Sequence, residues 1–360
     1  MKAAVALDFT RLSVEDVTLE APRAGEVLVK MAATGVCHSD LSVLHGAVPM
    51  PLPMVLGHEG AGVVQAVGPG VPGIQPGDHV VLSFIPTCGH CYFCDRHEPH
   101  LCVAGSPDGS MPDGTNRLRL GGQEVRAMAM LGCMAEYAVV PAMSLLRIDR
   151  SIALDRAALV GCGVMTGVGA VLHTAKVRPG GTVAVFGCGG VGLSAIQGAR
   201  LVGAKRIIAV DMLEAKLEYA RHFGATHTVN AADNPVEAIK ELTGGWGVDY
   251  SFEVTGKTSV MAQAYAATRR GGTVCVIGIG HYTESFPLNA CGFAPEGKTV
   301  VGCMYGNGNF KVDMADLLEL YLAKRLDLDA MITRTYSIDQ APQAFDDLQA
   351  GLNARGVIVF

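Results

Sequence analysis

The chain has 360 residues, of which 49% are hydrophobic and only 17% are charged. At roughly 100–200 residues per domain this length predicts two domains, and the apolar composition excludes a disordered chain. The net charge of −6 argues against a nucleic-acid-binding protein, which would carry a basic patch. Residues 1–8 hold too short an apolar stretch for a signal peptide. We therefore expect a cytoplasmic protein whose eleven cysteines serve metal binding or catalysis rather than disulfides.

Three residues that lie far apart in the sequence form a candidate metal site. The first two lie in a region whose sequence pattern indicates a mostly β domain. Short alternating runs broken by proline–glycine turns fill the first 150 residues. Cys37, His58 and Cys162 together offer two thiolates and one imidazole, the set of a catalytic zinc with an open fourth position. Each signal alone is weak, because a cysteine in an apolar segment is usually a small core residue. The other imidazole nitrogen needs a partner, and Asp40 and Glu59 are both candidates.

A compact group of four cysteines has the spacing C-x2-C-x2-C-x7-C: Cys88, Cys91, Cys94 and Cys102. Four thiolates on a short loop can enclose zinc and leave no position open for chemistry. An iron–sulfur loop of the bacterial type would end in C-x3-C-P, whereas here the last gap is seven residues and a valine follows. The pattern therefore predicts a structural zinc, with three nearby histidines at the surface: His90, His97 and His100.

An uncharged stretch at residues 157–175 has the length of a membrane span. Four glycines and one histidine dilute its hydrophobicity. We therefore do not expect it to cross a membrane.

A glycine-rich turn marks a second domain. The β-branched run Thr182–Phe186 leads into Gly187-Cys188-Gly189-Gly190-Val191-Gly192, and a helical pattern follows over residues 193–204. This is the G-x-G-x-x-G fingerprint of dinucleotide binding in its strand–turn–helix setting. The next strand, residues 206–210, ends in Asp211, where an acid is expected to bind the ribose hydroxyls. Its carboxylate would repel a 2′-phosphate and so favours NAD over NADP, and Lys216 could reach the same ribose.

Strand-like and helical segments continue to alternate up to residue 278. We expect strands at residues 226–229, 248–254 and 273–278, and helices at 235–242 and 259–268. Such βα alternation implies a parallel sheet covered on both faces.

The chain resembles the zinc-dependent medium-chain dehydrogenase/reductase family, in particular the alcohol dehydrogenases of the liver and glutathione-linked type. The resemblance extends over residues 2–360 and rests on five ordered motifs: GHEGAG (57–62), the four-cysteine loop, GCG (161–163), GCGGVG (187–192) and the ending RGVIVF (355–360). It implies an α/β fold with a GroES-like, mostly β catalytic domain at residues 1–163 and 305–360. A Rossmann domain with a doubly wound parallel sheet would be inserted at residues 164–304.

The resemblance also implies roles for single residues. Cys37, His58 and Cys162 would hold the catalytic zinc, with Glu59 behind the metal and Ser39 bonded to the alcohol. Cofactor contacts are implied for a larger set: His38, Thr166, Gly187, Gly189, Val191, Gly192, Asp211, Lys216, Ile277 and Arg355. Pocket-lining positions are implied for Phe84, Leu131, Ile279 and Met304.

The implied activity is the reversible NAD-linked oxidation of a medium-sized or aromatic primary alcohol to its aldehyde, through a zinc alkoxide and hydride transfer. Two zinc ions and NAD are the implied cofactors, and the partner is a small alcohol or aldehyde, with no nucleic acid or membrane. The length of the loop at residues 103–126 favours a homodimer over a tetramer. The family's relay histidine is replaced by Ser42, which leaves His45 as a possible but less expected substitute.

Alternative functions remain open at this point. Val48 and Ser106 stand where glutathione-linked enzymes use an acid and an arginine, which argues against a glutathione adduct but leaves a formaldehyde dehydrogenase that uses another small thiol. A non-catalytic dinucleotide sensor would be expected to lose the zinc ligands, and these are present. The sequence does not decide whether NADH exchanges or stays permanently bound.

Overall fold

The computed structural model describes all residues from Met1 to Phe360, and these form two compact units. The first unit comprises Met1–Gly163, Asn309–Lys324 and Leu328–Phe360, and the second comprises Val164–Gly308 and Arg325–Asp327. The expected boundaries differ from this division at residues 305–308 and 325–327, which belong to the second unit.

Close packing and hydrogen bonds explain why these two short segments belong to the second unit. The Cα of Gly306 lies against helix α3 (Met165–Gly169), where a Cβ built on Gly169 would come within 2.8 Å of it. The backbone of Asp327 is held by the Gln197 side chain, which accepts from its N–H at 2.8 Å and donates to its C=O at 3.2 Å. Hydrophobic periodicity carries no signal for either contact.

Two sheets form the framework of the first unit. A six-stranded sheet has the order β2-β1-β5-β9-β8-β3, and a seven-stranded one has the order β11-β7-β6-β4-β19-β18, with β10 paired to β4. The strands of the first sheet are β1 (Lys2–Asp8), β2 (Arg11–Asp16), β3 (Thr18–Leu19), β5 (Met54–Val55), β8 (Leu118–Leu120) and β9 (Gln123–Ala127). Those of the second are β4 (Glu26–Gly35), β6 (Gly60–Val67), β7 (His79–Leu82), β10 (Tyr137–Pro141), β11 (Leu145–Ile148), β18 (Ile332–Tyr336) and β19 (Arg355–Val359).

Short helices connect these strands. The α-helices are α1 (His38–Leu44), α2 (Leu154–Leu159), α9 (Phe310–Leu322) and α10 (Ala341–Gln349). Single turns are η1 (Cys94–Arg96), η2 (Pro99–Leu101), η3 (Met128–Met130), η4 (Ala142–Ser144), η8 (Ile338–Gln340) and the π-helical turn η5 (Val160–Val164).

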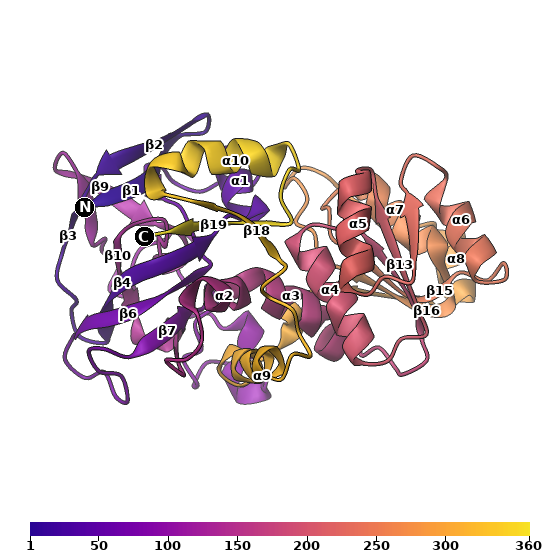
Figure 1. The fold of residues 1–360 in the computed structure, drawn as a ribbon, viewed down its shortest axis with the longest axis horizontal. Helices are drawn as coiled ribbons and strands as arrows, with labels where there is room; N and C mark the ends of the chain where they lie inside the picture. Colours follow the sequence, from indigo (N-terminus) through magenta and orange to yellow (C-terminus); the bar gives the residue numbers. More distant parts are fainter. The chain divides into compact units, whose positions relative to one another are not determined.

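Strand β4 organises the second sheet because its alternate residues are buried. Val27, Val29 and Met31 join the core cluster that also contains Val80 and Leu82 of β7. A shift of one residue would expose this whole set, so the apolar pattern fixes the register. The last strand of the chain, β19, pairs antiparallel with β4 and extends the sheet (Figure 1).

The second unit is a doubly wound parallel sheet in the order β14-β13-β12-β15-β16-β17, drawn in pink to orange in Figure 1. Its strands are β12 (Thr182–Phe186), β13 (Arg206–Asp211), β14 (His227–Asn230), β15 (Val248–Glu253), β16 (Thr268–Val276) and β17 (Thr299–Gly302). Its other helices are α4 (Gly190–Leu201), α5 (Glu214–Phe223), α6 (Pro235–Leu242), α7 (Thr258–Ala267), α8 (Ala290–Glu296), η7 (Tyr305–Asn307) and the π-helical turn η6 (Ala170–Thr174).

Alternation along the central strands distributes their side chains between two helical layers. Ala184, Phe186, Ile208 and Val210 pack with Ile239 of α6 in one core cluster. The intervening residues point to the opposite face, where α4 and α5 contact the sheet. Both faces are therefore buried, as the β-branched runs of the sequence predict.

The uncharged stretch lies in the helical segment Leu154–Thr174. This segment is long and apolar enough to cross a membrane, but 83% of its most apolar window is buried inside the protein. Burial of this kind is typical of a core helix, in agreement with the expectation from its glycines.

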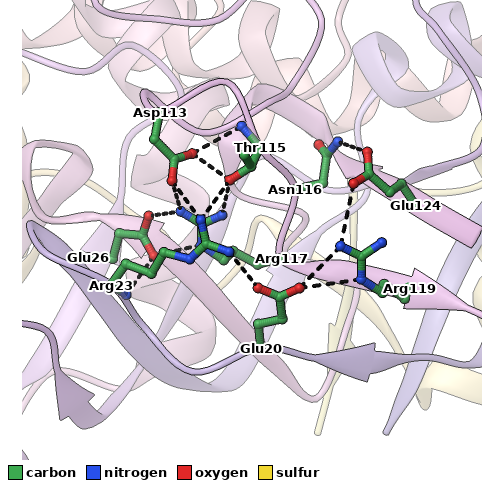
Figure 2. Close-up of polar contacts among 9 residues, drawn as sticks. All are labelled: Glu20, Arg23, Glu26, Asp113, Thr115, Asn116, Arg117, Arg119 and Glu124. Carbon is green, nitrogen blue, oxygen red and sulfur yellow. Dashed lines mark hydrogen bonds and ion pairs between the residues drawn. The ribbon is translucent and has the colours of Figure 1, made fainter. Parts of the chain in front are cut away.

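A network of ion pairs holds the loop that precedes β8 in place (Figure 2). The Arg117 guanidinium is only 2% exposed and binds Glu26, which is 6% exposed, and also Asp113. Arg23 bridges Asp113 and Glu20. Because Glu26 begins β4, the network ties the loop at residues 111–117 to the strand that organises the second sheet.

Candidate functional site

Four buried side chains of the first unit converge on one point. Cys37 immediately precedes α1, His58 and Glu59 immediately precede β6, and Cys162 lies on the π-helical turn η5. The ligand atoms of these four residues all lie within 4.8 Å of one another. A π-turn widens a helix locally and is frequent at functional sites, and here it carries Cys162.

Asp40 is the carboxylate that orients the candidate imidazole ligand. Its Oδ1 lies 3.2 Å from Nδ1 of His58 and accepts a hydrogen bond from the Gly57 backbone N–H at 2.8 Å. Asp40 is fully buried and His58 is 2% exposed. Of the two partners considered for His58, the structure therefore selects Asp40 over Glu59.

Glu59 pairs instead with Arg355 at the start of β19. Oε2 of Glu59 contacts the guanidinium, and both side chains are buried. Burial raises the pKa of Glu59 to about 8, although the Arg355 charge acts in the opposite direction. Sequence reasoning gave these residues separate roles and missed their pairing, because 296 positions separate them.

The donor set fits zinc. Nε2 of His58 is buried and has no hydrogen-bond partner, and an unpartnered buried nitrogen is costly unless a ligand satisfies it. The hydrogen bond between the two thiols lowers the pKa of Cys37 and raises that of Cys162, and a bound zinc would hold both as thiolates, the form that binds metals. Cys37, His58 and Cys162 would hold a catalytic zinc, with Glu59 adjacent.

The four-cysteine loop forms a second donor cluster. Its four sulfur atoms lie within 4.8 Å of one another, with 3.9 Å between Cys88 and Cys94 and 3.9 Å between Cys91 and Cys102. None of the loop histidines belongs to the cluster. His90 and His97 are exposed as expected, whereas His100 is half-buried.

The glycine-rich turn of the second unit shows three distinct steric roles. Gly187 has φ of +99°, which favours glycine. A Cβ on Gly189 would have no atom within 4 Å, whereas a Cβ on Gly192 would stand 1.9 Å from the Gly187 carbonyl oxygen. Open space at the second glycine and contact at the third are what a dinucleotide fingerprint requires. The turn therefore fits a pyrophosphate beside the N-terminus of α4.

Asp211 lies beside this turn at the end of β13. Its Oδ2 accepts from the Cys188 backbone N–H at 2.8 Å and its Oδ1 from the Leu213 N–H at 3.0 Å. Helix α3 also approaches the turn, because a Cβ on Gly167 would stand 2.3 Å from the Val191 carbonyl oxygen. The structure thus gathers Asp211, Val191 and α3, which carries Thr166, at one end of the sheet. Lys216 lies in α5 and is 8% exposed.

The remaining candidate residues are more dispersed. His38 is exposed in the first turn of α1, and Ile277 follows β16. Ile279 and Met304, both in the second unit, are 62% and 39% exposed. Leu131 is buried in a core cluster of the first unit.

The first unit contains a cavity of about 280 Å³. Its lining is mostly apolar: Met50, Phe84, Ile85, Gly105, Ser106, Pro107, Met128, Ala129 and Met130. The Phe84 ring packs edge-on against His58, with 5.5 Å between ring centroids. Phe84 is thus the one predicted pocket residue found in this lining. Ala129 and Met130 have φ of +54° and +62°, a left-handed conformation that costs free energy in residues other than glycine.

Two family models match the chain in succession. One, described as an alcohol dehydrogenase GroES-like domain, matches residues 23–150, and the other, described as a zinc-binding dehydrogenase, matches residues 190–323. The chain belongs to the zinc-dependent medium-chain dehydrogenase family. Among its relatives in this family, the NDMA-dependent alcohol dehydrogenase of Amycolatopsis methanolica is 41% identical over 352 residues, which cover 96% of this chain and 95% of the relative. The putative alcohol dehydrogenase D of Mycobacterium tuberculosis is 40% identical over 349 residues, with coverage of 96% and 95%.

Solved structures of the family have the same fold. An alcohol dehydrogenase zinc-binding domain protein from Burkholderia ambifaria gives a TM-score of 0.94 at 37% identity, covering 100% of this chain and 98% of that one. Benzyl alcohol dehydrogenase from Acinetobacter calcoaceticus gives a TM-score of 0.94 at 34% identity, covering 100% and 99%.

These relatives confirm the predicted fold class, a GroES-like catalytic domain with an inserted Rossmann domain. They also confirm a zinc-type alcohol dehydrogenase that uses zinc and a nicotinamide cofactor. The narrower liver and glutathione-linked type stays a prediction.

Proposed function

We propose that this protein is an NAD-dependent alcohol dehydrogenase with two zinc ions per chain that interconverts a medium-sized or aromatic primary alcohol and its aldehyde. The observation that supports this substrate class is the apolar cavity of about 280 Å³, whose Phe84 wall touches the candidate ligand His58. An apolar cavity of about 150 Å³ is sufficient for benzene. The cavity therefore has room for a benzyl group or a short alkyl chain.

Different residues of the chain would have different roles in catalysis. Bound zinc would supply a Lewis acid and the nicotinamide a hydride acceptor. Asp40 holds His58 in the tautomer that leaves Nε2 free to ligate. The Ser39 hydroxyl lies 3.8 Å from the Cys37 sulfur and would bond the alcohol oxygen and receive its proton. His45 is exposed at the end of α1, so the proton beyond Ser39 passes to solvent without a buried histidine.

The choice of NAD and the count of two zinc ions rest on separate features. Asp211 presents a carboxylate beside the dinucleotide turn, and this charge disfavours a 2′-phosphate. The two cysteine-containing clusters share no residue, so each would hold its own ion. Metal analysis of the purified protein should give about two zinc ions per chain.

A substrate series tests the proposed class. We expect kcat/KM with NAD to rise from ethanol to hexanol by roughly fourfold for each buried methylene group. We also expect a high kcat/KM for benzyl alcohol. The variant Met50→Trp, which narrows the cavity, should lower kcat/KM for benzyl alcohol more than for ethanol. No gain with substrate size would contradict the proposal, as would activity on formaldehyde only in the presence of an added thiol.

The cofactor is tested in the same assay. One relative is described as NDMA-dependent, so turnover is measured with NAD alone and with NDMA added. Heating the purified protein and measuring released NADH shows whether the cofactor exchanges or remains bound.

A further inference from the structure

A fully buried carboxylate lies at the end of a central strand of the second unit, outside the residues assigned above. Glu253 is the last residue of β15 and is 0% exposed. A buried carboxylate is costly unless hydrogen bonds compensate for its lost hydration, and desolvation raises the pKa of Glu253. Its position at the carboxyl edge of a doubly wound sheet is where such folds bind ligands.

One oxygen of Glu253 organises the turn that follows β15. Oε1 accepts hydrogen bonds from the Thr255 backbone N–H at 2.7 Å, the Thr255 hydroxyl at 2.5 Å and the Gly256 N–H at 3.0 Å. The second oxygen, Oε2, is buried and has no partner. All the groups that bind this side chain are donors, so the site matches an acceptor-only carboxylate.

The same residue holds a second loop through its backbone. The N–H groups of Ile277 and Gly278 both donate to the Glu253 carbonyl oxygen, at 2.8 and 3.1 Å. A Cβ on Gly278 would stand 2.0 Å from the Gly256 nitrogen and 2.9 Å from Oε2 of Glu253. The loops after β15 and β16 are thus in direct backbone contact, with the carboxylate beside them.

The turn held by Glu253 reaches the dinucleotide fingerprint. A Cβ on Gly187 would stand 2.8 Å from Cγ2 of Thr255, and the Val254 N–H donates to the Phe186 carbonyl oxygen at 3.0 Å. The hydrogen bonds that hold the Thr255 side chain therefore also fix the surface that lies against Gly187. The contacts form a continuous path from Glu253 through Thr255 to Gly187.

We propose that Glu253 is a positioning residue of the cofactor site: its carboxylate locks Thr255 against Gly187 and the β15 loop against the β16 loop, and so sets the affinity for NAD and NADH. This inference rests on the proposed NAD-dependent function. Glu253 touches neither the substrate nor the reacting atoms, and it acts through the shape of the two loops.

The test uses the full-length protein and measures the NADH dissociation constant by fluorescence titration. Glu253→Leu removes the acceptor of all three hydrogen bonds, so the dissociation constant should rise about tenfold or more, which corresponds to about 1.4 kcal/mol. Thr255→Val removes the hydroxyl bond but keeps a methyl against Gly187, and should weaken binding in the same direction. Thr255→Ser keeps the hydroxyl bond but loses the Cγ2 methyl group beside Gly187, so it should weaken binding by a smaller factor than Glu253→Leu, which frees all three donors.

Two further measurements separate positioning from general destabilisation. In Glu253→Leu and Thr255→Val the KM for NAD should rise while kcat stays near wild type, the sign of lost uniform binding, and zinc content should be unchanged. Equal NADH affinity in wild type and Glu253→Leu would overturn the inference alone. Failure of the wild type to bind NADH would overturn both the inference and the proposed cofactor. Wild-type NADH affinity in Thr255→Val would also overturn it, because the hydroxyl bond to Glu253 would then be irrelevant.

Discussion

Substitution by alanine should have different effects at two glycines of the dinucleotide turn: weaker cofactor binding at Gly189 and lower stability at Gly192. Gly189 has φ of −77° and its Cβ direction is open, whereas a Cβ on Gly192 would stand 1.9 Å from the Gly187 carbonyl oxygen. Gly189→Ala should therefore fold normally but place a methyl group where the pyrophosphate approaches the N-terminus of α4. Gly192→Ala should force the turn and the helix apart before any cofactor binds.

The magnitudes follow from these distances. For Gly189→Ala the reduced freedom of the unfolded chain adds about 0.4–1 kcal/mol to stability, and the poorer helix cap removes a similar amount. The cofactor-free protein should thus keep its Tm, while the NADH dissociation constant rises at least about tenfold, or 1.4 kcal/mol. For Gly192→Ala, overpacking costs about 1–3 kcal/mol, and each kcal/mol lowers Tm by about 2–4 °C in a domain of this size.

Thermal unfolding of the cofactor-free protein and NADH fluorescence titration, run on both variants, decide the matter. Wild-type NADH affinity in Gly189→Ala would refute the assignment of this turn to the pyrophosphate. An unchanged Tm in Gly192→Ala would refute the steric role of the third glycine.

Four other substitutions have defined outcomes. Ser39→Ala should abolish most alcohol oxidation, whereas His45→Ala should retain most of it because the imidazole is exposed; a strongly altered pH–rate profile in His45→Ala would contradict this. Cys162→Ser should lower the zinc content from about two ions per chain to about one and eliminate activity, as measured by metal analysis; retention of both ions would show that Cys162 is not a ligand. Glu26→Gln should lower the free energy of unfolding, measured in urea, by about 3 kcal/mol, because it removes the main counter-charge of the buried Arg117 guanidinium. A loss below about 1 kcal/mol would show that Asp113 alone compensates for the charge of Arg117.

Features with local sequence signals were predicted well. The strand Thr182–Phe186 and the helix Pro235–Leu242 have the bounds expected from periodicity. Ligand clustering was also predictable, because cysteine spacing limits what four thiolates on one loop can do.

Features that depend on long-range packing were not predictable. The cavity wall at Ala129 and Met130 has left-handed backbone, although neither residue type favours it. Leu131, one residue further, is turned into the core instead of the cavity. The Glu26–Arg117 pair spans 91 residues, and no period in the sequence marks two charged residues as partners in a core.

The position of strand β19 late in the sequence implies an order in which the two units fold during synthesis. Strand β19 supplies Arg355, the partner of Glu59, and completes one edge of β4 next to Gly35. A ribosome that has made the first 163 residues has made every candidate zinc ligand but not this strand. Nearly the whole cofactor unit emerges before it, and domains tend to fold as units during synthesis. The zinc unit should therefore reach its native state after the cofactor unit, with Glu59 lacking its counter-charge until Arg355 has left the ribosome.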